Sequence, residues 1–353
     1  MTGSPDVAVI GGGIAGCATA ALLAEGGASV TLYEREAIGA GASGRNSGII
    51  QHPMDPALAG LYEASLALYD ALGHGFELPD EARGVLLVSE DGEALRRDFE
   101  AAGARFPDLA PEWLEGDALR AEEPALAPGL SAYRLATGRP IGPTAATRAW
   151  AERARSAGAR VELGREVRAG ELSAGAVVVA AGPWTPAALG ARPGWRPVYA
   201  NWGVVAEVRL AQPPRHSLEQ AGIEALTEPG GAAGSLFSLV TTDAASAVGS
   251  TFSPEPPDPA ALARPILEHG ARYVPALAGA AIEHVRACAR PLSADGRPLL
   301  GELADGLHVV TGHGAWGVTL GPGSAKLVAD VLLGIRDAIP PELRAARCGA
   351  ASR

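Results

Sequence analysis

The chain has 353 residues, of which 47% are hydrophobic and 20% charged, and its formal net charge at pH 7 is -11. This length suits one large or two modest domains, and the composition is typical of a folded globular protein rather than a disordered one. Because the chain is acidic and has no cluster of lysine and arginine, we expect no nucleic-acid partner and no binding to an anionic membrane.

Cysteine usage favours a reducing compartment. Cys17, Cys288 and Cys348 are too few and too far apart in sequence for a disulfide framework or a zinc site, so we expect a cytoplasmic protein without a bound metal. The uncharged segment 7–24 is not interpreted as a signal peptide or a membrane span, because Asp6 precedes it and four glycines interrupt it.

Residues 7–34 carry the most specific pattern in the chain. An apolar run over 7–10 predicts a buried strand, a GxGxxG turn leads into a helix, and a second strand over 29–33 ends at Glu34. The predicted contacts of the turn are Gly11, Gly13, Ile14, Ala15 and Gly16. The glycines allow the tight turn, close approach to a pyrophosphate and close helix packing, and the helix N-terminus offers free N–H groups. Glu34 can accept hydrogen bonds from a ribose diol and disfavours a 2′-phosphate. The segment therefore predicts a dinucleotide, FAD or NAD, rather than NADP.

The following loop, residues 38–50, reads IGAGASGRNSGII. Its small residues allow close backbone approach, and Arg45 can neutralise phosphate charge. Here the sequence resembles the D-amino-acid oxidase (DAO) superfamily of FAD-dependent amine oxidoreductases, especially its glycine oxidase and sarcosine oxidase branches. The resemblance implies FAD as the cofactor and a loop that runs under the pyrophosphate and along the flavin. The implied contacts in it are Ser43, Arg45, Asn46, Ser47 and Gly48.

The resemblance extends over nearly the whole chain. It implies a helix at 117–126 before the substrate domain and a return to the cofactor domain over 138–163, where Thr144 could cap a helix with Trp150 on its inner face. Residues 177–182 and 307–312 are expected as strands that end beside the cofactor. Further implied cofactor contacts are Arg35, Val167, Ala181, Gly182, Trp184, Gly314, Trp316, Gly317, Val318 and Thr319.

The expected fold class is α/β. A Rossmann-like FAD-binding domain of the glutathione-reductase type carries an inserted, mostly antiparallel α+β substrate domain. The alternating runs 202–210, 235–241 and 246–252 predict half-buried strands of that insert. The expected FAD domain comprises 1–75, 141–197 and 284–340, the substrate domain 76–140 and 198–283, and the C-terminal tail 341–353.

The segment RACARPLSADGRP, residues 286–298, predicts a strand followed by a turn. By resemblance to glycine oxidase, Arg290 would clamp the substrate carboxylate, a role that suits a guanidinium. The alternative is an arginine in a structural salt bridge. Arg286 has no such match and is expected at the surface or in an ion pair.

Cys288 has two possible interpretations. It precedes Asp295 by the spacing at which sarcosine oxidases carry the cysteine that holds their flavin covalently. The sequence at 289–291 instead resembles glycine oxidase, whose flavin is not tethered, and a buried cysteine is usually a small apolar residue.

The motif GHGAWGVTLGP, residues 312–322, would place backbone N–H groups of the last helix against the flavin, where they stabilise negative charge. Ala315 stands where glycine oxidase has a second arginine, and Trp316 adds bulk. The sequence thus favours a substrate with one carboxylate and an apolar portion rather than glycine. His52 and His313 are candidate catalytic or pocket residues, and Tyr199, Trp202 and Phe237 are candidate lining residues.

The resemblance implies oxidation of an amino acid or a carboxylate-bearing secondary amine, by hydride transfer from the α-carbon to flavin N5 and hydrolysis of the imine. Lys326, the sole lysine, lies in the last helix, away from where sarcosine oxidases use a lysine to activate oxygen, so oxidase and dehydrogenase both stay open. Two alternatives are a 2-hydroxy-acid oxidoreductase, which needs a base such as His52 or His313, and an electron-transferring flavin subunit of a hetero-oligomer. The expected partner is a small amine or amino acid, and a homo-oligomer is a further possibility.

Overall fold

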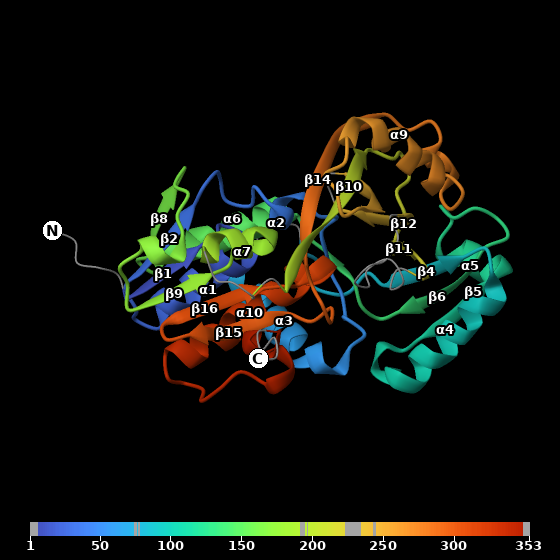
Figure 1. Ribbon diagram of the computed structural model, residues 1–353. Coiled ribbons are helices and arrows are strands. Elements are labelled where there is room, and N and C mark those ends of the chain that lie inside the picture. The colour runs from blue at the N-terminus through green and yellow to red at the C-terminus, as the bar shows by residue number, and fades with distance from the viewer. Residues whose placement is uncertain are drawn as a thin grey trace.

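The computed structural model describes residues 6–73, 76, 78–190, 195, 197–222, 234–242 and 245–348. Two sheets organise it, and they lie in two lobes that meet along the long strand β14 (Figure 1). The first is a mostly parallel sheet flanked by helices, and the second is a larger, mostly antiparallel sheet. The mixed α/β fold class expected from the sequence is confirmed.

The first sheet has the strand order β15-β16-β9-β1-β2-β8. Its members are β1 (Val7–Ile10), β2 (Val30–Glu34), β8 (Arg160–Leu163), β9 (Ala176–Val179), β15 (Leu299–Ala304) and β16 (Leu307–Thr311). All neighbours pair in parallel except β15, which is antiparallel to β16 at the edge. β1 is buried on both faces, which explains why it is a continuous apolar run.

Helices cover one face of this sheet. They are α1 (Ile14–Glu25), α3 (Ala59–Leu72), α6 (Pro143–Ser156) and α10 (Gly317–Leu332), and α1 packs against both α6 and α10. The other face packs against α7 (Thr185–Leu189), Trp195 and Ala345 near the end of the described chain. Trp150 of α6 is fully buried, as expected. Thr144 does not cap α6, contrary to prediction: the helix begins after Gly142, and the Thr144 hydroxyl donates to the Gly44 carbonyl oxygen at 2.9 Å.

The second sheet has the order β14-β10-β13-β12-β11-β4-β6-β5. Its strands are β4 (Val85–Ser89), β5 (Glu112–Glu115), β6 (Ser131–Leu135), β10 (Val198–Val208), β11 (Ser217–Gln220), β12 (Gly234–Thr241), β13 (Ser246–Phe252) and β14 (Ile282–Ser293). Only the β11–β4 pair is parallel. α5 (Gly116–Glu122) and α9 (Pro259–Gly270) pack on one face, and α4 (Gly92–Arg105) packs against β6. The face opposite α9 packs against α4 at its β6 end, and other residues of this face line a cavity.

Short elements connect the two sheets. β3 (Ile49–Ile50) pairs with β7 (Arg139–Pro140), and α2 (Ala42–Arg45) precedes them. The short helical turns are η1 (Pro56–Leu58), η2 (Pro107–Leu109), η3 (Ala169–Glu171), η4 (Gly182–Trp184), η5 (Pro275–Leu277), η6 (Gly314–Trp316), η7 (Pro341–Leu343) and η8 (Ala345–Cys348).

One expected domain boundary falls inside a strand, and another separates residues 341–348 from the sheet against which they pack. Residue 284 lies within β14, which pairs with β10 up to Ser293, so this strand belongs to the second sheet. Residues 341–348 pack against the first sheet, because Ala345 is fully buried and Arg347 binds the Asp295 carboxylate through two bonds of 2.8 Å. We propose that the domains divide near Ser293 and that the described part of the tail belongs to the cofactor domain.

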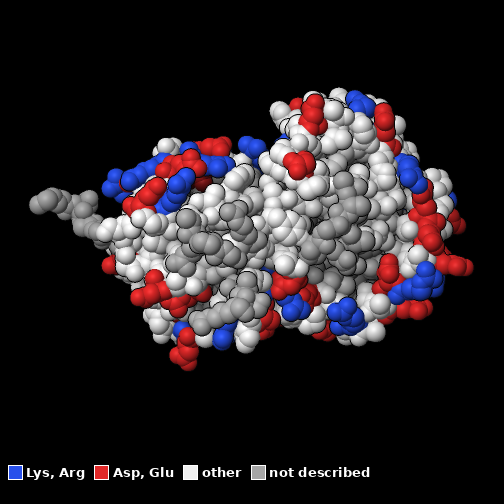
Figure 2. Space-filling view, viewed as in Figure 1, with Lys and Arg blue, Asp and Glu red and all other residues white. Residues whose placement is uncertain are grey.

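The surface is mixed in charge. In Figure 2, acidic and basic side chains are interspersed over the visible face, and neither sign covers a whole lobe. Within the described part of the chain, no helix combines the length and the apolar character needed to cross a membrane.

Candidate active site

A cavity of about 760 Å³ lies between the two sheets. Its lining comes from the carboxyl ends of β1, β2, β9 and β16, from the loop 40–54 and the start of α10, and from strands β10 to β14 and β4. Every cofactor or catalytic candidate named from the sequence lines it except Gly16. Gly16 has a packing role, because a Cβ atom there would overlap the Gly11 carbonyl oxygen.

The turn between β1 and α1 is shaped for close approach by a ligand. Gly11 has φ of +113°, and a Cβ atom on it would lie 2.5 Å from the Ala180 carbonyl oxygen, so only glycine fits there. The N-cap residue of α1 is Gly13, which has no side chain to cap the helix, and no acid stands in the first turn. The Ile14 N–H donates to the Ser43 hydroxyl at 2.9 Å. The helix therefore offers an anion its N-terminal dipole.

Glu34 ends β2 beside this turn. Its carboxylate accepts the N–H of Gly12 at 2.6 Å and the N–H of Glu36 at 2.8 Å. A carboxylate has about four lone-pair sites, so these bonds fix it without exhausting it as an acceptor for ribose hydroxyls. Next to it, the Arg35 guanidinium lies 4.3 Å from the centre of the Trp184 ring. This end of the cavity therefore has a fixed hydrogen-bond acceptor, the Glu34 carboxylate, and two planar groups, Arg35 and Trp184. An adenosine needs both, an acceptor for its ribose hydroxyls and a flat surface for its base.

The loop that crosses the cavity is held by its own side chains. The Asn46 amide donates to the carbonyl oxygens of Ala42 at 2.9 Å and Ser43 at 3.0 Å, and it accepts the Gly48 N–H at 2.8 Å. Asn46 therefore fixes the loop, in addition to lining the cavity. Arg45 donates to the Ala287 carbonyl oxygen at 3.5 Å and so reaches β14.

The start of α10 is a second uncapped helix end. No side chain caps it and no acid stands in its first turn. The Tyr69 hydroxyl donates to the Val318 carbonyl oxygen at 2.8 Å, and the Thr319 hydroxyl accepts the Gln51 N–H at 3.3 Å. Its free N–H groups can stabilise negative charge on a ligand in the cavity. With the glycine turn and Glu34, the residues present fit a dinucleotide cofactor.

Arg290 enters the cavity from β14. Its guanidinium donates to the Thr251 carbonyl oxygen at 3.0 Å, to the Asn201 side chain at 3.4 Å and to the Ser250 hydroxyl, and it lies 4.6 Å from the centre of the Phe252 ring. Burial lowers the pKa of this group. Among the described residues, no aspartate or glutamate lies within ion-pairing distance of it.

Arg286 differs from Arg290 although both lie on one face of β14. It forms an ion pair with Glu207 and donates to the Asn46 carbonyl oxygen at 3.2 Å. The expectation of an ion-pairing residue is confirmed. Arg290 is partly buried and has no acidic partner among the described residues, and an uncompensated charge withdrawn from water is costly.

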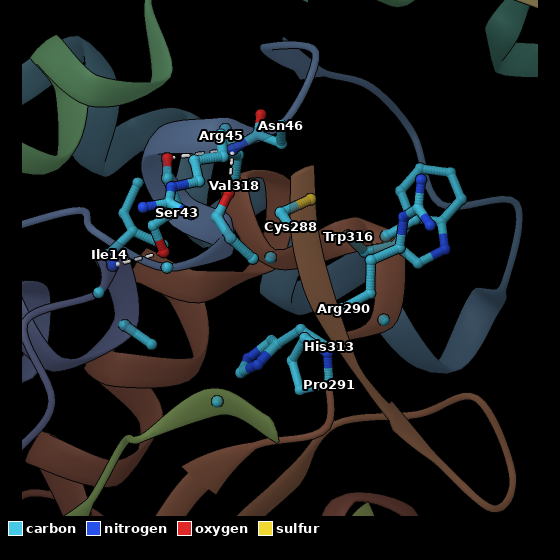
Figure 3. Close-up of a pocket in the computed structure, with 18 of the residues that line it drawn as sticks. Ile14, Ser43, Arg45, Asn46, Cys288, Arg290, Pro291, His313, Trp316 and Val318 are labelled. Atoms are coloured by element: carbon cyan, nitrogen blue, oxygen red, sulfur yellow. Dashed lines mark hydrogen bonds between the residues drawn. The ribbon is translucent and has the colours of Figure 1, made fainter. Parts of the chain in front are cut away.

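Cys288 lies between these arginines and lines the cavity. Figure 3 shows it on the same strand as Arg290, with Ser43 of the cavity loop to one side. Burial raises the pKa of its thiol, which the nearby Arg290 and Arg286 only partly oppose. The thiol is therefore protonated at neutral pH, and both interpretations of Cys288, with and without a covalent flavin bond, stay untested.

Both candidate histidines line the cavity in neutral form. His313 is 4% exposed, its Nε2 lies 3.0 Å from the Ser324 hydroxyl, and burial lowers its pKa to about 4. His52 accepts the Met54 N–H at Nδ1, and burial lowers its pKa as well. Each has one ring nitrogen engaged in a local hydrogen bond.

The substrate-domain wall was only partly predicted. Trp202 lines the cavity as expected, whereas Tyr199 is 36% exposed and Phe237 stacks on Tyr273 beneath the sheet. The sequence interpretation missed Val85, Leu87, Tyr133, Leu135, Glu219, Ser238, Val240 and Gln51. For the residues of β4 and β6, the alternation of side chains between the two faces of a strand was the available signal. Every second residue of these strands, 85 and 87 or 133 and 135, faces the cavity.

Comparison with known proteins places the chain in a family. The family described as "FAD dependent oxidoreductase" (DAO) matches residues 6–331. Glycine oxidase of Geobacillus kaustophilus is 29% identical over 369 aligned positions that cover 94% of each chain. Its crystal structure superposes with a TM-score of 0.84 over 98% of this chain and 99% of that one, at 26% identity. A bifunctional tRNA-modifying protein of Nitrosospira multiformis, MnmC, is 44% identical over 99 residues, and the match spans only 15% of its length. The match over 6–331 shows that this chain belongs to the DAO family of FAD-dependent oxidoreductases.

Proposed function

We propose that the protein oxidises an amino acid, or a secondary amine that carries a carboxylate, with the carboxylate bound by Arg290. The partly buried Arg290 guanidinium, which has no acidic partner among the described residues, carries this proposal. The similarity to glycine oxidase, an enzyme named for an amino-acid substrate, supports it.

In this proposal Arg290 donates two parallel hydrogen bonds to the substrate carboxylate. A guanidinium matches a carboxylate in this way and keeps its charge when buried. Ser250, the Thr251 carbonyl oxygen and Asn201 hold it in place, so little side-chain entropy is lost when the ligand binds. Removing one partner of such a pair costs about 2–5 kcal/mol.

Other residues of the cavity would bind the cofactor and contact the rest of the substrate. The glycine turn, Glu34 and the start of α10 would hold FAD, which supplies a two-electron oxidant for the bond between the α-carbon and its hydrogen. The protein orients the substrate and limits the access of water. Trp202 and Phe252 supply apolar surface beside the clamp.

The histidines do not favour the 2-hydroxy-acid alternative. Such a substrate needs a base for its hydroxyl proton. Burial lowers the pKa of His313 to about 4, so it is a weak base, and the Met54 N–H occupies the lone pair of His52 Nδ1, so the neutral His52 ring carries its proton on Nε2. Amine oxidation needs only the neutral amine, so no such base is required.

The test is anaerobic reduction of the FAD-loaded protein. D- and L-amino acids, N-methyl amino acids and 2-hydroxy acids are added, and loss of the visible flavin band is followed. We expect an amino acid or N-methyl amino acid to bleach the band and Arg290→Met to abolish this. Arg209→Met is the control, because Arg209 is exposed and pairs with Glu283. Bleaching by hydroxy acids alone would overturn the proposal. So would bleaching by no substrate together with a co-purifying partner, which would favour an electron-transferring subunit.

A further inference from the structure

A serine hydroxyl without a partner lies in the substrate end of the cavity. Ser238, on β12, lines the cavity and is 7% exposed. Among the described residues its hydroxyl has no hydrogen-bond partner, and its oxygen is not fully enclosed, so a ligand in the cavity can reach it. Once a ligand displaces water from the cavity, this hydroxyl is left unsatisfied unless the ligand bonds to it, and an unsatisfied buried hydroxyl is costly.

Gly249 keeps this hydroxyl open to the cavity. It is the direct partner of Ser238 on β13. A Cβ atom on Gly249 would lie 3.3 Å from Ser238 Oγ and 3.7 Å from Cγ2 of Val205. Because glycine has no side chain, the space between Ser238 and Val205 stays free for part of a ligand.

Ser250 supplies a second free O–H group on the neighbouring strand. It lines the cavity and is 6% exposed. Because a guanidinium only donates, Ser250 Oγ accepts the bond from Arg290, and its own proton has no acceptor among the described residues. Ser250 therefore has a proton to donate to a ligand, and Ser238 can both donate and accept.

The sheet order places Ser238 on the side of the clamp that lies away from the cofactor. The edge strand β14 contacts α2 and η6, which border the cofactor end of the cavity, and β12 is the third strand from it. The strand spacing of about 4.8 Å and the rise of about 3.3 Å per residue put Ser238 and Ser250 roughly 6 Å apart. Since the reacting α-carbon faces the flavin, a substrate group directed toward β12 belongs to the side chain.

We propose that Ser238 and Ser250 form a subsite for a carboxamide at the end of a short substrate side chain. This inference rests on the proposed function, because it takes the substrate carboxylate to be bound at Arg290. A carboxamide has both an acceptor oxygen and N–H donors, which match a hydroxyl that donates and a hydroxyl that also accepts. The serines carry no charge, so they would not compensate a second carboxylate withdrawn from water. The substrate class is thus an amino acid such as asparagine or glutamine.

The first experiment measures binding without turnover. 4-Carbamoylbutanoate and 5-methylhexanoate have the same shape, but the first ends in a carboxamide and the second in an isopropyl group. Both lack an α-amine, so neither is a substrate. Their dissociation constants come from the change in the visible spectrum of the FAD-loaded protein. We expect Ser238→Ala to weaken 4-carbamoylbutanoate about three- to tenfold, as for one lost hydrogen bond, and to change 5-methylhexanoate by less than about twofold.

Ser217→Ala is the matched control. Ser217 is a buried serine on β11 whose hydroxyl also lacks a partner among the described residues, but it is enclosed and does not line the cavity. This variant should change neither dissociation constant. Urea unfolding without ligand separates binding from folding: a hydroxyl without a partner adds nothing to stability, so Ser238→Ala should be no less stable than the wild type.

The second experiment measures reduction rates with amino acids of matched shape. Glutamine and 2-amino-5-methylhexanoate, and asparagine and leucine, are compared as both enantiomers. We expect Ser238→Ala to lower kcat/KM for the carboxamide substrate about three- to tenfold and to leave kcat/KM for its apolar counterpart unchanged. Bound FAD in each variant is checked by its spectrum.

The outcomes separate the two proposals. If amino acids reduce the flavin but Ser238→Ala affects neither member of a pair, the subsite is refuted while the function stands. The subsite is refuted as well if Ser238→Ala affects both members alike, because the hydroxyl then contacts the carboxylate or the α-amine that all amino acids share. If Arg290→Met leaves the binding of 5-methylhexanoate unchanged and no amine reduces the flavin, the proposed function itself fails.

Discussion

Gly203 is the position where a single methyl group tests the carboxylate clamp most directly. It lies on β10, and a Cβ atom added there would be 2.5 Å from both Cζ and Nη1 of Arg290. Its φ is not in the left-handed region, so alanine is compatible with the backbone. Because the obstructing atoms end a flexible side chain, Gly203→Ala should displace the guanidinium rather than unfold the strand.

The expected loss of activity in Gly203→Ala follows from the interactions that the displaced guanidinium loses. Its bonds to Ser250 and the Thr251 carbonyl oxygen hold the group where a carboxylate would meet it. Complete loss of a buried charge pair costs about 2–5 kcal/mol, and partial displacement costs the lower part of that range. We expect Gly203→Ala to lower kcat/KM for an amino acid roughly 30- to 300-fold, with 1.4 kcal/mol for each factor of ten. FAD binding should not change, because Gly203 does not line the cavity.

The assay is stopped-flow reduction of the flavin over a range of substrate concentrations, with FAD affinity and urea unfolding measured in parallel. Gly103→Ala is the control: a Cβ atom there meets nothing within 4 Å, so this variant should keep its activity. If Gly203→Ala kept wild-type kcat/KM while Arg290→Met lost it, Arg290 would not act from the position described here. Loss of FAD from Gly203→Ala would also refute the reasoning.

Three further outcomes are expected. Glu34→Ala should weaken FAD binding roughly ten- to hundredfold in a fluorescence titration, because the Gly12 N–H and the ribose lose an acceptor worth about 1–3 kcal/mol. The pKa of His313 is about 4 in the folded protein and near 6.5 when unfolded, so the unfolded chain binds more protons as pH falls from 6.5 to 4. Stability should therefore fall over that window by up to about 3 kcal/mol, and His313→Gln should lose this dependence in urea unfolding at pH 7.5 and 5. Acid precipitation should release the flavin from the wild type, since burial keeps the Cys288 thiol protonated; yellow colour that stays with the pellet, and is lost in Cys288→Ala, would show a tether.

The cofactor end of the cavity could be anticipated because its determinants are local in sequence. Gly11 and Gly16 are required by contacts with Ala180 and with the turn itself, and Glu34 follows from the end of β2. A buried parallel strand, a glycine turn and an acid at the end of the next strand are together compatible with few structures other than a dinucleotide-binding βαβ unit. The last helix could be predicted in the same way, from the motif at 312–322, and its uncapped start faces the cavity.

The substrate end could not be anticipated in the same way, because it depends on which strands become neighbours. Glu219 reaches Gln51 across 168 positions of sequence, and β11 pairs in parallel with β4 within an otherwise antiparallel sheet. Phe237 looked like a lining residue in an alternating strand, yet its ring lies on the face that packs against α9. Alternation predicts two faces but does not say which one is the cavity.

The two arginines of β14 show how a partner strand assigns roles that the local sequence leaves open. Arg286 and Arg290 stand four residues apart on one face, and each reaches the residue two positions beyond its direct partner on β10. For Arg286 that residue is Glu207, which neutralises it; for Arg290 it is Gly203, which leaves room and supplies no charge. In antiparallel register, two residues four apart on β14 face two residues four apart on β10. Exchanging Glu207 and Gly203 would therefore exchange the roles of the two arginines. A carboxylate at position 203 would pair with Arg290, which could then no longer bind a ligand carboxylate. The arginine that we propose as the clamp is thus specified as much by a glycine 87 residues earlier in the chain as by its own strand.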